Sequence, residues 1–330
     1  MWLVNDINSE MPRWVKKVPR RSYRALMEVA TAGAWVCNIR NAHLLPKKNG
    51  QLYLQTWHAS SVFASKLAER DDEAHLSPGY INCAKYDGSI IDGALSQCPK
   101  QSRFYRESFW LNANAEILEF GGPREDCLFQ EQYVMDRRIA LRQLVGVSDE
   151  DYVVLYAPTF RDDGSTWAYR LDFSVIVDAF ERRVGRHCVI LVRLHPNAVG
   201  MANEIEYGES VIDFSAIGDA NDAVIICDAL LTDYSTIVYE ASLLGKPSFY
   251  CAIDRDEYAK LRSVDPDSYN YPFIKASSCE ELAIHISTLN FEEYQRSISA
   301  YLTASGTFDD GNASVRTVDW LVNKMGVDHR

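Results

Sequence analysis

Short apolar runs recur along the chain, and longer stretches with helical periodicity separate them. The runs with the composition of buried strands are residues 33–36, 51–56, 115–120, 152–157, 188–194, 211–214, 229–232 and 248–251. Strands that alternate with helices in this way usually become parallel neighbours in a sheet. The pattern therefore predicts an α/β fold built on parallel sheets.

Helix signals lie between these runs. Asp172 has the position of an N-cap, and Ser278 and Glu281 have the spacing of a capping box. We interpret 221–227 as helix, because a strand there would crowd the next strand. The predicted helices are residues 130–145, 173–184, 221–227, 254–261 and 282–289.

The segment from 228 to 250 is the most informative stretch. It combines an apolar strand (229–232), a polar turn (233–236) and an amphipathic helix that ends at Gly245. Free N–H groups at a helix N-terminus bind phosphate readily, and open α/β sheets bind ligands at the carboxyl ends of their strands. Ser235 and Thr236 are therefore candidate phosphate ligands, although such residues also cap helices that bind nothing.

With 330 residues, the chain is too long for one typical core, and two domains are expected. Gly121, Gly122 and Pro123 end one strand run, and an acidic turn at 148–151 precedes the next. We place the boundary at residue 150, with an N-terminal domain (1–150) and a C-terminal domain (151–330). Two Rossmann-like domains would face each other across a cleft, the first trimmed at its front.

Composition narrows the function. A net charge of −12 argues against general nucleic-acid binding, and no apolar run has the ~20 residues of a membrane span. The N-terminus lacks a signal-peptide pattern. Eight cysteines without a CxxC motif fit a reducing cytoplasm better than a disulfide framework or zinc site. No set of metal ligands is evident, so we expect no resident cofactor; a loosely held Mg²⁺ is compatible with the sequence.

One segment departs from the acidic average. Residues 11–27 contain six basic residues, no acidic ones, and interleaved aromatic side chains such as Trp14 and Tyr23. A basic, aromatic segment can bind an anionic membrane surface, so residues 13–24 are a candidate membrane contact on the inner face of the cell membrane. The alternative is a solvated helix face, and Pro12 and Pro19 interrupt any long helix.

Candidate chemistry follows the predicted strands. His58 follows the strand at 51–56 and can act as a general base, or it can be a structural histidine bonded to the backbone. Arg124 follows a Gly-Gly-Pro turn and can bind an anion, or it can be a surface residue of a linker.

Two more loops carry polar groups. Thr159, Phe160 and Arg161 follow the strand at 152–157, where the alternative is an Arg–Asp pair within the loop. Arg193 and His195 lie on one side of a strand end, which suits a diphosphate; the alternative is a buried histidine beside a surface arginine.

Two residues further along the chain complete the candidates. Glu240 lies one turn into the helix after the phosphate turn and can accept the two hydroxyls of a ribose; the alternative is a helix-surface glutamate. Arg262 lies in a polar loop after the helix at 254–261, where the alternative is simple solvation.

Taken in order, these pieces resemble the CDP-glycerol glycerophosphotransferase family, the teichoic acid primases and polymerases with a GT-B-type fold. The matching strings are QTWH (55–58), GGPRED (121–126), YAPTFRD (156–162), RLHP (193–196), LLTDYSTIVYEASLLGKPSFY (230–250) and DGNAS (310–314). After His58 this chain has Ala59-Ser60-Ser61 where the family has Gly-Thr-Pro. This departure bears on the substrate more than on the fold.

The resemblance implies His58 as the base, His195 on the diphosphate and Glu240 on the ribose. Together with the loops above, the predicted substrate-binding set is Arg124, Thr159, Phe160, Arg161, Arg193, Ser235, Thr236, Glu240 and Arg262. The expected enzyme transfers a polyol phosphate, from CDP-glycerol, to a hydroxyl of a cell-wall or capsule glycopolymer or a lipid-linked acceptor and releases CMP. The alternatives are a GT-B glycosyltransferase or epimerase that uses a nucleotide sugar, and a degenerate binding protein.

Overall fold

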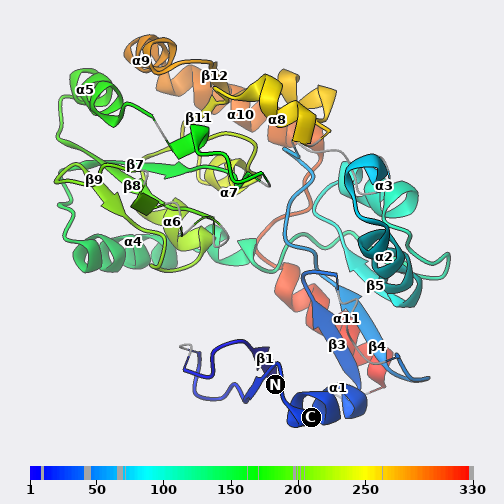
Figure 1. Cartoon of the computed structure of the whole chain (residues 1–330). Helices are drawn as coiled ribbons and strands as arrows, with labels where there is room; N and C mark the ends of the chain where they lie inside the picture. The colour runs from blue at the N-terminus through cyan, green and yellow to red at the C-terminus, as the bar shows by residue number, and fades with distance from the viewer. Residues whose placement is uncertain are drawn as a thin grey trace.

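Two parallel sheets with flanking helices make up the computed structural model of the chain (Figure 1). The structure describes residues 1–8, 11–40, 46–64, 70, 72–161, 163–169, 171–195, 198, 200, 202–203, 205–261 and 263–326. The predicted α/β fold with parallel sheets is confirmed.

The first sheet has four parallel strands in the order β3-β4-β5-β6. They are β3 (Ala34–Cys37), β4 (Leu52–Gln55), β5 (Gly93–Leu95) and β6 (Glu116–Leu118), accompanied by helices α1 (Tyr23–Thr31), α2 (Pro78–Ile90) and α3 (Pro99–Ser108). Trp35, Tyr53, Tyr105 and Phe109 fill one core of this sheet. A separate parallel pair, β1 (Trp2–Val4) and β2 (Lys17–Pro19), precedes it.

The second sheet has six parallel strands in the order β12-β11-β10-β7-β8-β9. They are β7 (Tyr152–Ala157), β8 (Cys188–Val192), β9 (Val211–Asp213), β10 (Ala229–Thr232), β11 (Ser248–Cys251) and β12 (Ile274–Ala276). Its helices are α5 (Phe173–Val184), α6 (Ala220–Ile226), α7 (Val238–Leu243), α8 (Arg255–Leu261), α9 (Cys279–Thr288) and α10 (Phe291–Ser305). The central strands β7 and β8 are buried along their whole length, as their continuous apolar runs predict.

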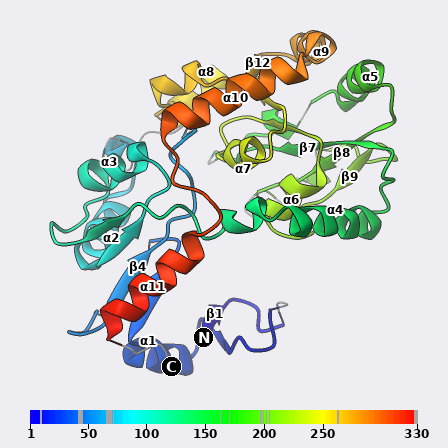
Figure 2. The ribbon, with the colours of Figure 1, turned by 180° about the vertical axis from the view of Figure 1, so that it is seen from behind.

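The chain crosses between the two halves near both ends of this second unit (Figure 2). After β6 it passes through a short 3₁₀ helix (Glu125–Phe129) into α4 (Glu131–Val145), which packs on α6. At the other end α11 (Ala313–Met325) returns to the first sheet, where Trp320 packs against Leu54, Leu95 and Leu118. The predicted boundary at residue 150 itself stays a prediction.

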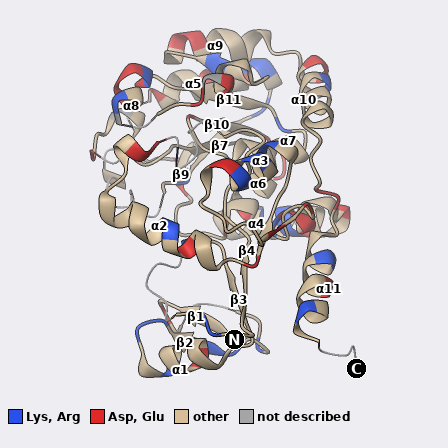
Figure 3. Cartoon of the chain, turned by 90° about the vertical axis from the view of Figure 1, so that its right-hand side faces the viewer, with Lys and Arg blue, Asp and Glu red and all other residues tan. Residues whose placement is uncertain are grey.

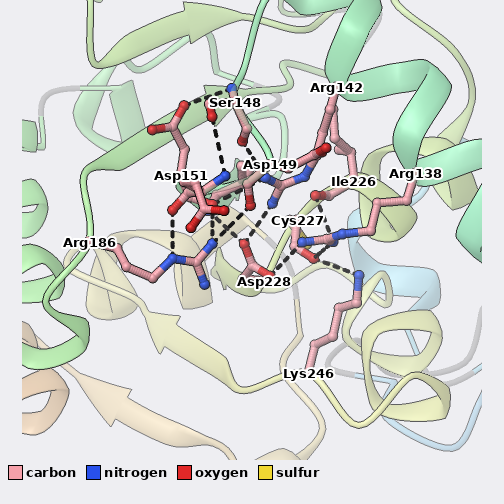
Figure 4. A network of polar contacts seen from close by, with 12 residues as sticks. Arg138, Arg142, Ser148, Asp149, Asp151, Arg186, Ile226, Cys227, Asp228 and Lys246 are labelled. Carbon is pink, nitrogen blue, oxygen red and sulfur yellow. Dashed lines mark hydrogen bonds and ion pairs between the residues drawn. The ribbon is translucent and has the colours of Figure 1, made fainter.

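Cations from α4 and from the loop before β11 close the C-terminal end of α6 (Figure 4). Arg138 Nη1 donates to the carbonyls of Ile225, Ile226 and Cys227 at 2.9–3.0 Å, and Lys246 Nζ donates to Cys227 O at 2.6 Å. These carbonyls have no partner within the helix, and the helix dipole favours positive charge there. Burial lowers the pKa of Lys246 to about 8.

Within the part of the chain that the structure describes, none of the helices is long and apolar enough to cross a membrane.

Candidate active site

The candidate residues gather where strands of both sheets end. His58 follows β4 and is exposed, and its Nδ1 lies 2.7 Å from Asn38 O. Because a carbonyl only accepts, Nδ1 carries the hydrogen in the neutral ring, and Nε2 is the basic nitrogen. Trp57, directly before it, has a φ of 56°. A left-handed bulky residue is an outlier of the kind that clusters at active sites.

Arg124 connects the two halves of the site. Its Nη1 lies 3.4 Å from His58 O, its Nε donates to Glu125 Oε1 at 2.9 Å, and its Nη2 donates to Glu240 Oε1. Both glutamates are buried, and burial raises the pKa of both carboxyls, to about 8 for Glu125. The positive charge of Arg124 acts in the opposite direction and lowers both pKa values. Arg124 and Glu240, predicted separately from the sequence, therefore lie in contact.

Two polar atoms of predicted donor-binding residues are buried without a hydrogen-bond partner among the described residues. They are Oε2 of Glu240 and Oγ1 of Thr159. Buried polar atoms are nearly always paired in folded proteins, and an orphan calls for an explanation such as a missing ligand. The two atoms come from the ends of neighbouring strands, β10 with its helix and β7.

The polar turn after β10 is built around a buried carboxylate. Asp233 Oδ1 accepts the backbone N–H groups of Thr159 at 2.8 Å and Tyr234 at 2.6 Å. Ser235 Oγ accepts the N–H of Ile237 at 3.3 Å, and both Ser235 and Thr236 are half-buried. Five residues lie between the strand and the helix that follows, α7, which begins at Val238 and has only six residues. The turn is therefore longer and the helix shorter than the sequence pattern suggests.

Arg161 lies behind this turn and is 1% exposed. Its guanidinium donates to Asp233 at 2.7 Å and to Asp254 at 2.6 and 3.0 Å, and its Nη1 donates to Thr159 O at 2.5 Å. The stacked rings of Tyr234 and Tyr258 lie within 5.1 Å of it. Arg161 thus holds the turn and the β7 loop together through two carboxylates; Asp162, its partner in the sequence-based alternative, lies outside the described residues.

The two predicted residues of the loop after β8 lie in different surroundings. His195 is exposed, and the ring of Phe160 stacks on it at a centroid distance of 6.0 Å. Arg193 instead donates to the carbonyls of Ile217 at 2.8 Å and Gly218 at 3.2 Å, and burial lowers its pKa. His195 therefore faces the neighbouring predicted loop, whereas the guanidinium of Arg193 holds the segment after β9. Arg262 lies outside the described residues.

Sequence reasoning missed a half-buried carboxylate, Asp309, that lies close enough to Glu125 and Glu240 to raise their pKa. Asp309 accepts the N–H of Gly122 at 2.6 Å and an N–H of Gln97 at 3.3 Å, and it also accepts the hydroxyl of Tyr239. Its position directly before the DGNAS string was the available signal. Gly121, with a φ of 84°, allows this close approach. Among the described residues no group of three or more His, Cys, Asp or Glu side chains is placed to hold a metal ion. That the protein has no resident cofactor stays a prediction.

Comparisons with known proteins identify the family of the chain. A family model described as CDP-glycerol:poly(glycerophosphate) glycerophosphotransferase matches residues 1–323. The chain is 27% identical over 326 residues to the teichoic acid poly(glycerol phosphate) polymerase of Staphylococcus epidermidis. The matched region covers 94% of this chain and 44% of that protein. The chain is 26% identical to the teichoic acid poly(glycerol phosphate) polymerase of Bacillus spizizenii, over 98% of this chain and 83% of that protein.

A solved structure is similar over nearly the whole chain. The wall teichoic acid polymerase TagF matches with a TM-score of 0.80 at 27% identity, over 97% of this chain and 80% of that one. The fold, two Rossmann-like halves, is therefore shared with a solved polymerase. The chain spans less than half of the Staphylococcus epidermidis relative and most of the Bacillus spizizenii relative.

Proposed function

This chain belongs to the CDP-glycerol:poly(glycerophosphate) glycerophosphotransferase family, and from that premise we propose that it transfers glycerol phosphate from CDP-glycerol to an acceptor hydroxyl. The acceptor is a cell-wall or capsule glycopolymer or its lipid-linked primer, and the second product is CMP. Similarity to two teichoic acid poly(glycerol phosphate) polymerases supports the choice of donor.

The reaction needs a base on one side of the site and an anion-stabilising group on the other. Nε2 of His58 takes the proton of the acceptor hydroxyl, and the oxygen attacks the β-phosphorus. A new P–O bond forms, the bond between the β-phosphorus and the bridging oxygen breaks, and CMP leaves with the electron pair. His195 and the turn at Ser235 and Thr236 stabilise the charge on the diphosphate. Such transfers depend on positioning and electrostatics rather than on a covalent intermediate.

The orphaned oxygens of Glu240 and Thr159 are the observation that carries this proposal. A ribose offers two hydroxyl donors to Glu240 Oε2, and Thr159 Oγ1 can donate to a phosphate oxygen. Arg124, already in contact with Glu240 and the His58 carbonyl, places positive charge between the base and the ribose.

A donor screen tests the proposal. The full chain is incubated with CDP-glycerol, CDP-ribitol and a UDP-sugar in the presence of a polyol-phosphate primer, and release of CMP or UDP is measured. We expect CMP from CDP-glycerol, and we expect His58→Ala to lose turnover while still binding donor. Release of UDP alone would favour the nucleotide-sugar enzyme, and donor binding without any release would favour a degenerate member.

We further propose that the chain acts at the inner face of the cell membrane. The basic segment 11–27 forms β2 and the start of α1, beside the N-terminus in Figure 3. Val18 points inward and is fully buried, whereas Trp14 is 83% and Tyr23 is 78% exposed. Large aromatic side chains exposed among arginines are typical of a surface that binds anionic lipid headgroups.

A further inference from the structure

The loop that carries His58 is attached to the opposite half of the molecule. Val62 and Phe63 follow β4 of the first sheet, yet they are 2% and 0% exposed within the core cluster of the second sheet. In Figures 1 and 2 the blue chain that leaves β4 runs up to α10. The strand itself packs in the first half, where Tyr53 and Leu54 belong to separate clusters.

Phe63 fits into a cage of four aromatic rings. Its ring centroid lies 4.6 Å from Phe273, 4.9 Å from Tyr301, 5.4 Å from Tyr271 and 6.4 Å from Tyr239. These rings come from α7, α10 and the segment before β12, all of the second half. Aromatic rings at these spacings and tilts attract one another beyond the effect of burial.

One hydrogen bond ties the chain to the second half directly after this ring, and another, within the loop itself, lies directly before it. Tyr271 donates its hydroxyl to Ala64 O at 2.7 Å, and Val62 N donates to Ser60 Oγ at 3.3 Å. Phe63 lies five positions after His58, which limits their separation to about 17 Å even in a fully extended chain. The position of His58 therefore depends on the second half, which carries Glu240, as well as on its own strand.

We propose that Phe63 is a positioning residue that fixes the His58 loop to the donor-binding half, so that the base keeps its distance from the donor phosphate. The inference rests on the proposed role of His58. It predicts a loss of turnover without a loss of donor affinity when the cage is emptied, because the donor-binding side chains stay in place.

The test compares Phe63→Ala and Phe63→Leu with Phe180→Leu. Phe180 is the matched control, since it is 1% exposed and packs against Tyr152 and Phe249 in the same core, away from His58. For Phe63→Ala we expect kcat for CMP release to fall about tenfold or more, with KM for CDP-glycerol within about threefold of wild type. We expect Phe63→Leu to have a higher kcat than Phe63→Ala. If the alanine variant does not fold, Phe63→Leu is compared with Phe180→Leu instead.

Hydrogen exchange gives a second measurement that needs no activity. We expect the amides of residues 57–62 to exchange faster in the Phe63 variants than in wild type, and to exchange as in wild type in Phe180→Leu. Three results would each overturn the positioning role of Phe63. They are a wild-type kcat in Phe63→Ala, an equal loss of kcat in Phe180→Leu, and unchanged exchange at 57–62. If wild-type protein releases no CMP from CDP-glycerol, the proposed function fails, and the exchange data alone decide whether Phe63 holds the loop.

Discussion

Glu240 combines burial, an ion pair and an unpaired oxygen in one side chain. Its Oε1 accepts from Arg124 while Oε2 has no hydrogen-bond partner among the described residues. We expect Glu240→Gln to weaken CDP binding by about 10- to 100-fold, because hydrogen bonds to a charged group contribute about 1.5–3 kcal/mol. Titration calorimetry with CDP measures this. Glu125→Gln, a buried neighbour on the same arginine, is the control and should bind CDP nearly as wild type; equal affinities in both variants would contradict a ribose role.

The carboxyl of Glu125 gives the fold an unusual pH dependence. Burial raises its pKa to about 8, from an unfolded value near 4.5, so the folded state binds the proton more tightly. Its contribution to stability is complete below about pH 4.5 and is lost as pH rises through 8. We expect the melting temperature of wild type, relative to Glu125→Gln, to fall between pH 5 and 8.5. Parallel curves would show that this carboxyl is ionised throughout.

The site residues stay predictions, but the structure shows which of them the local sequence pattern brought together and which contacts it could not show. His58, Thr159 and Glu240 could be found because each follows an apolar strand, and parallel strands gather their carboxyl ends. The role of Arg161 could not be found, because its partner Asp254 lies 93 residues away and adjacency suggested Asp162 instead. A local pattern shows that an arginine is present, but it does not show which distant carboxylate pairs with it.

Helix α11 is capped by a carboxylate from the distant 3₁₀ helix Glu125–Phe129. Asp126 accepts the N–H groups of Ala313 at 2.9 Å and Ser314 at 2.7 Å, while its own N-cap, Asn312, makes no side-chain capping bond. We expect Asp126→Ala to lower the free energy of unfolding by about 1–2 kcal/mol, since a cap and a charge at the helix N-terminus are lost together. Urea denaturation measures it.

The matched control for this cap is Asp310→Ala. Asp310 is an exposed carboxylate on the same helix start and pairs with Arg316 at 2.7 Å. A surface ion pair contributes about 0–1 kcal/mol, so this variant should change stability less. Equal losses in the two variants would mean that Asp126 does not act as the cap.

Most elements were predictable because each carries its own local signal. All eight predicted strands are confirmed as β3, β4 and β6 to β11, and the helix after Asp172 is confirmed as α5. The three-residue strands β1, β2, β5 and β12 were missed, although β6 and β9, which are equally short, were found. Likewise, nothing local shows that α11 packs on the first sheet, since that contact joins residues more than 200 positions apart.

At the scale of the whole molecule, charge separates one region from the rest. The chain carries a net charge of −12, and yet residues 11–27 contain six basic side chains and no acidic ones. An anionic membrane would repel most of such a molecule and attract this segment, so the proposed membrane contact would orient the protein.

This arrangement predicts orientation-specific binding to anionic vesicles. Arg20 and Arg21 are the best positions to change, because the neighbouring Arg24 already pairs with Glu28 at 3.7 Å. We expect Arg20→Glu with Arg21→Glu to weaken sedimentation with phosphatidylglycerol vesicles about tenfold or more, since each basic residue near the surface contributes about 1 kcal/mol. Arg182→Glu with Arg296→Glu changes the net charge equally, but on helices of the second half, and should leave binding unchanged. If both double variants lose binding equally, only net charge matters and the segment is not the contact; added salt should weaken wild-type binding in either case, because it screens charges beyond about 10 Å.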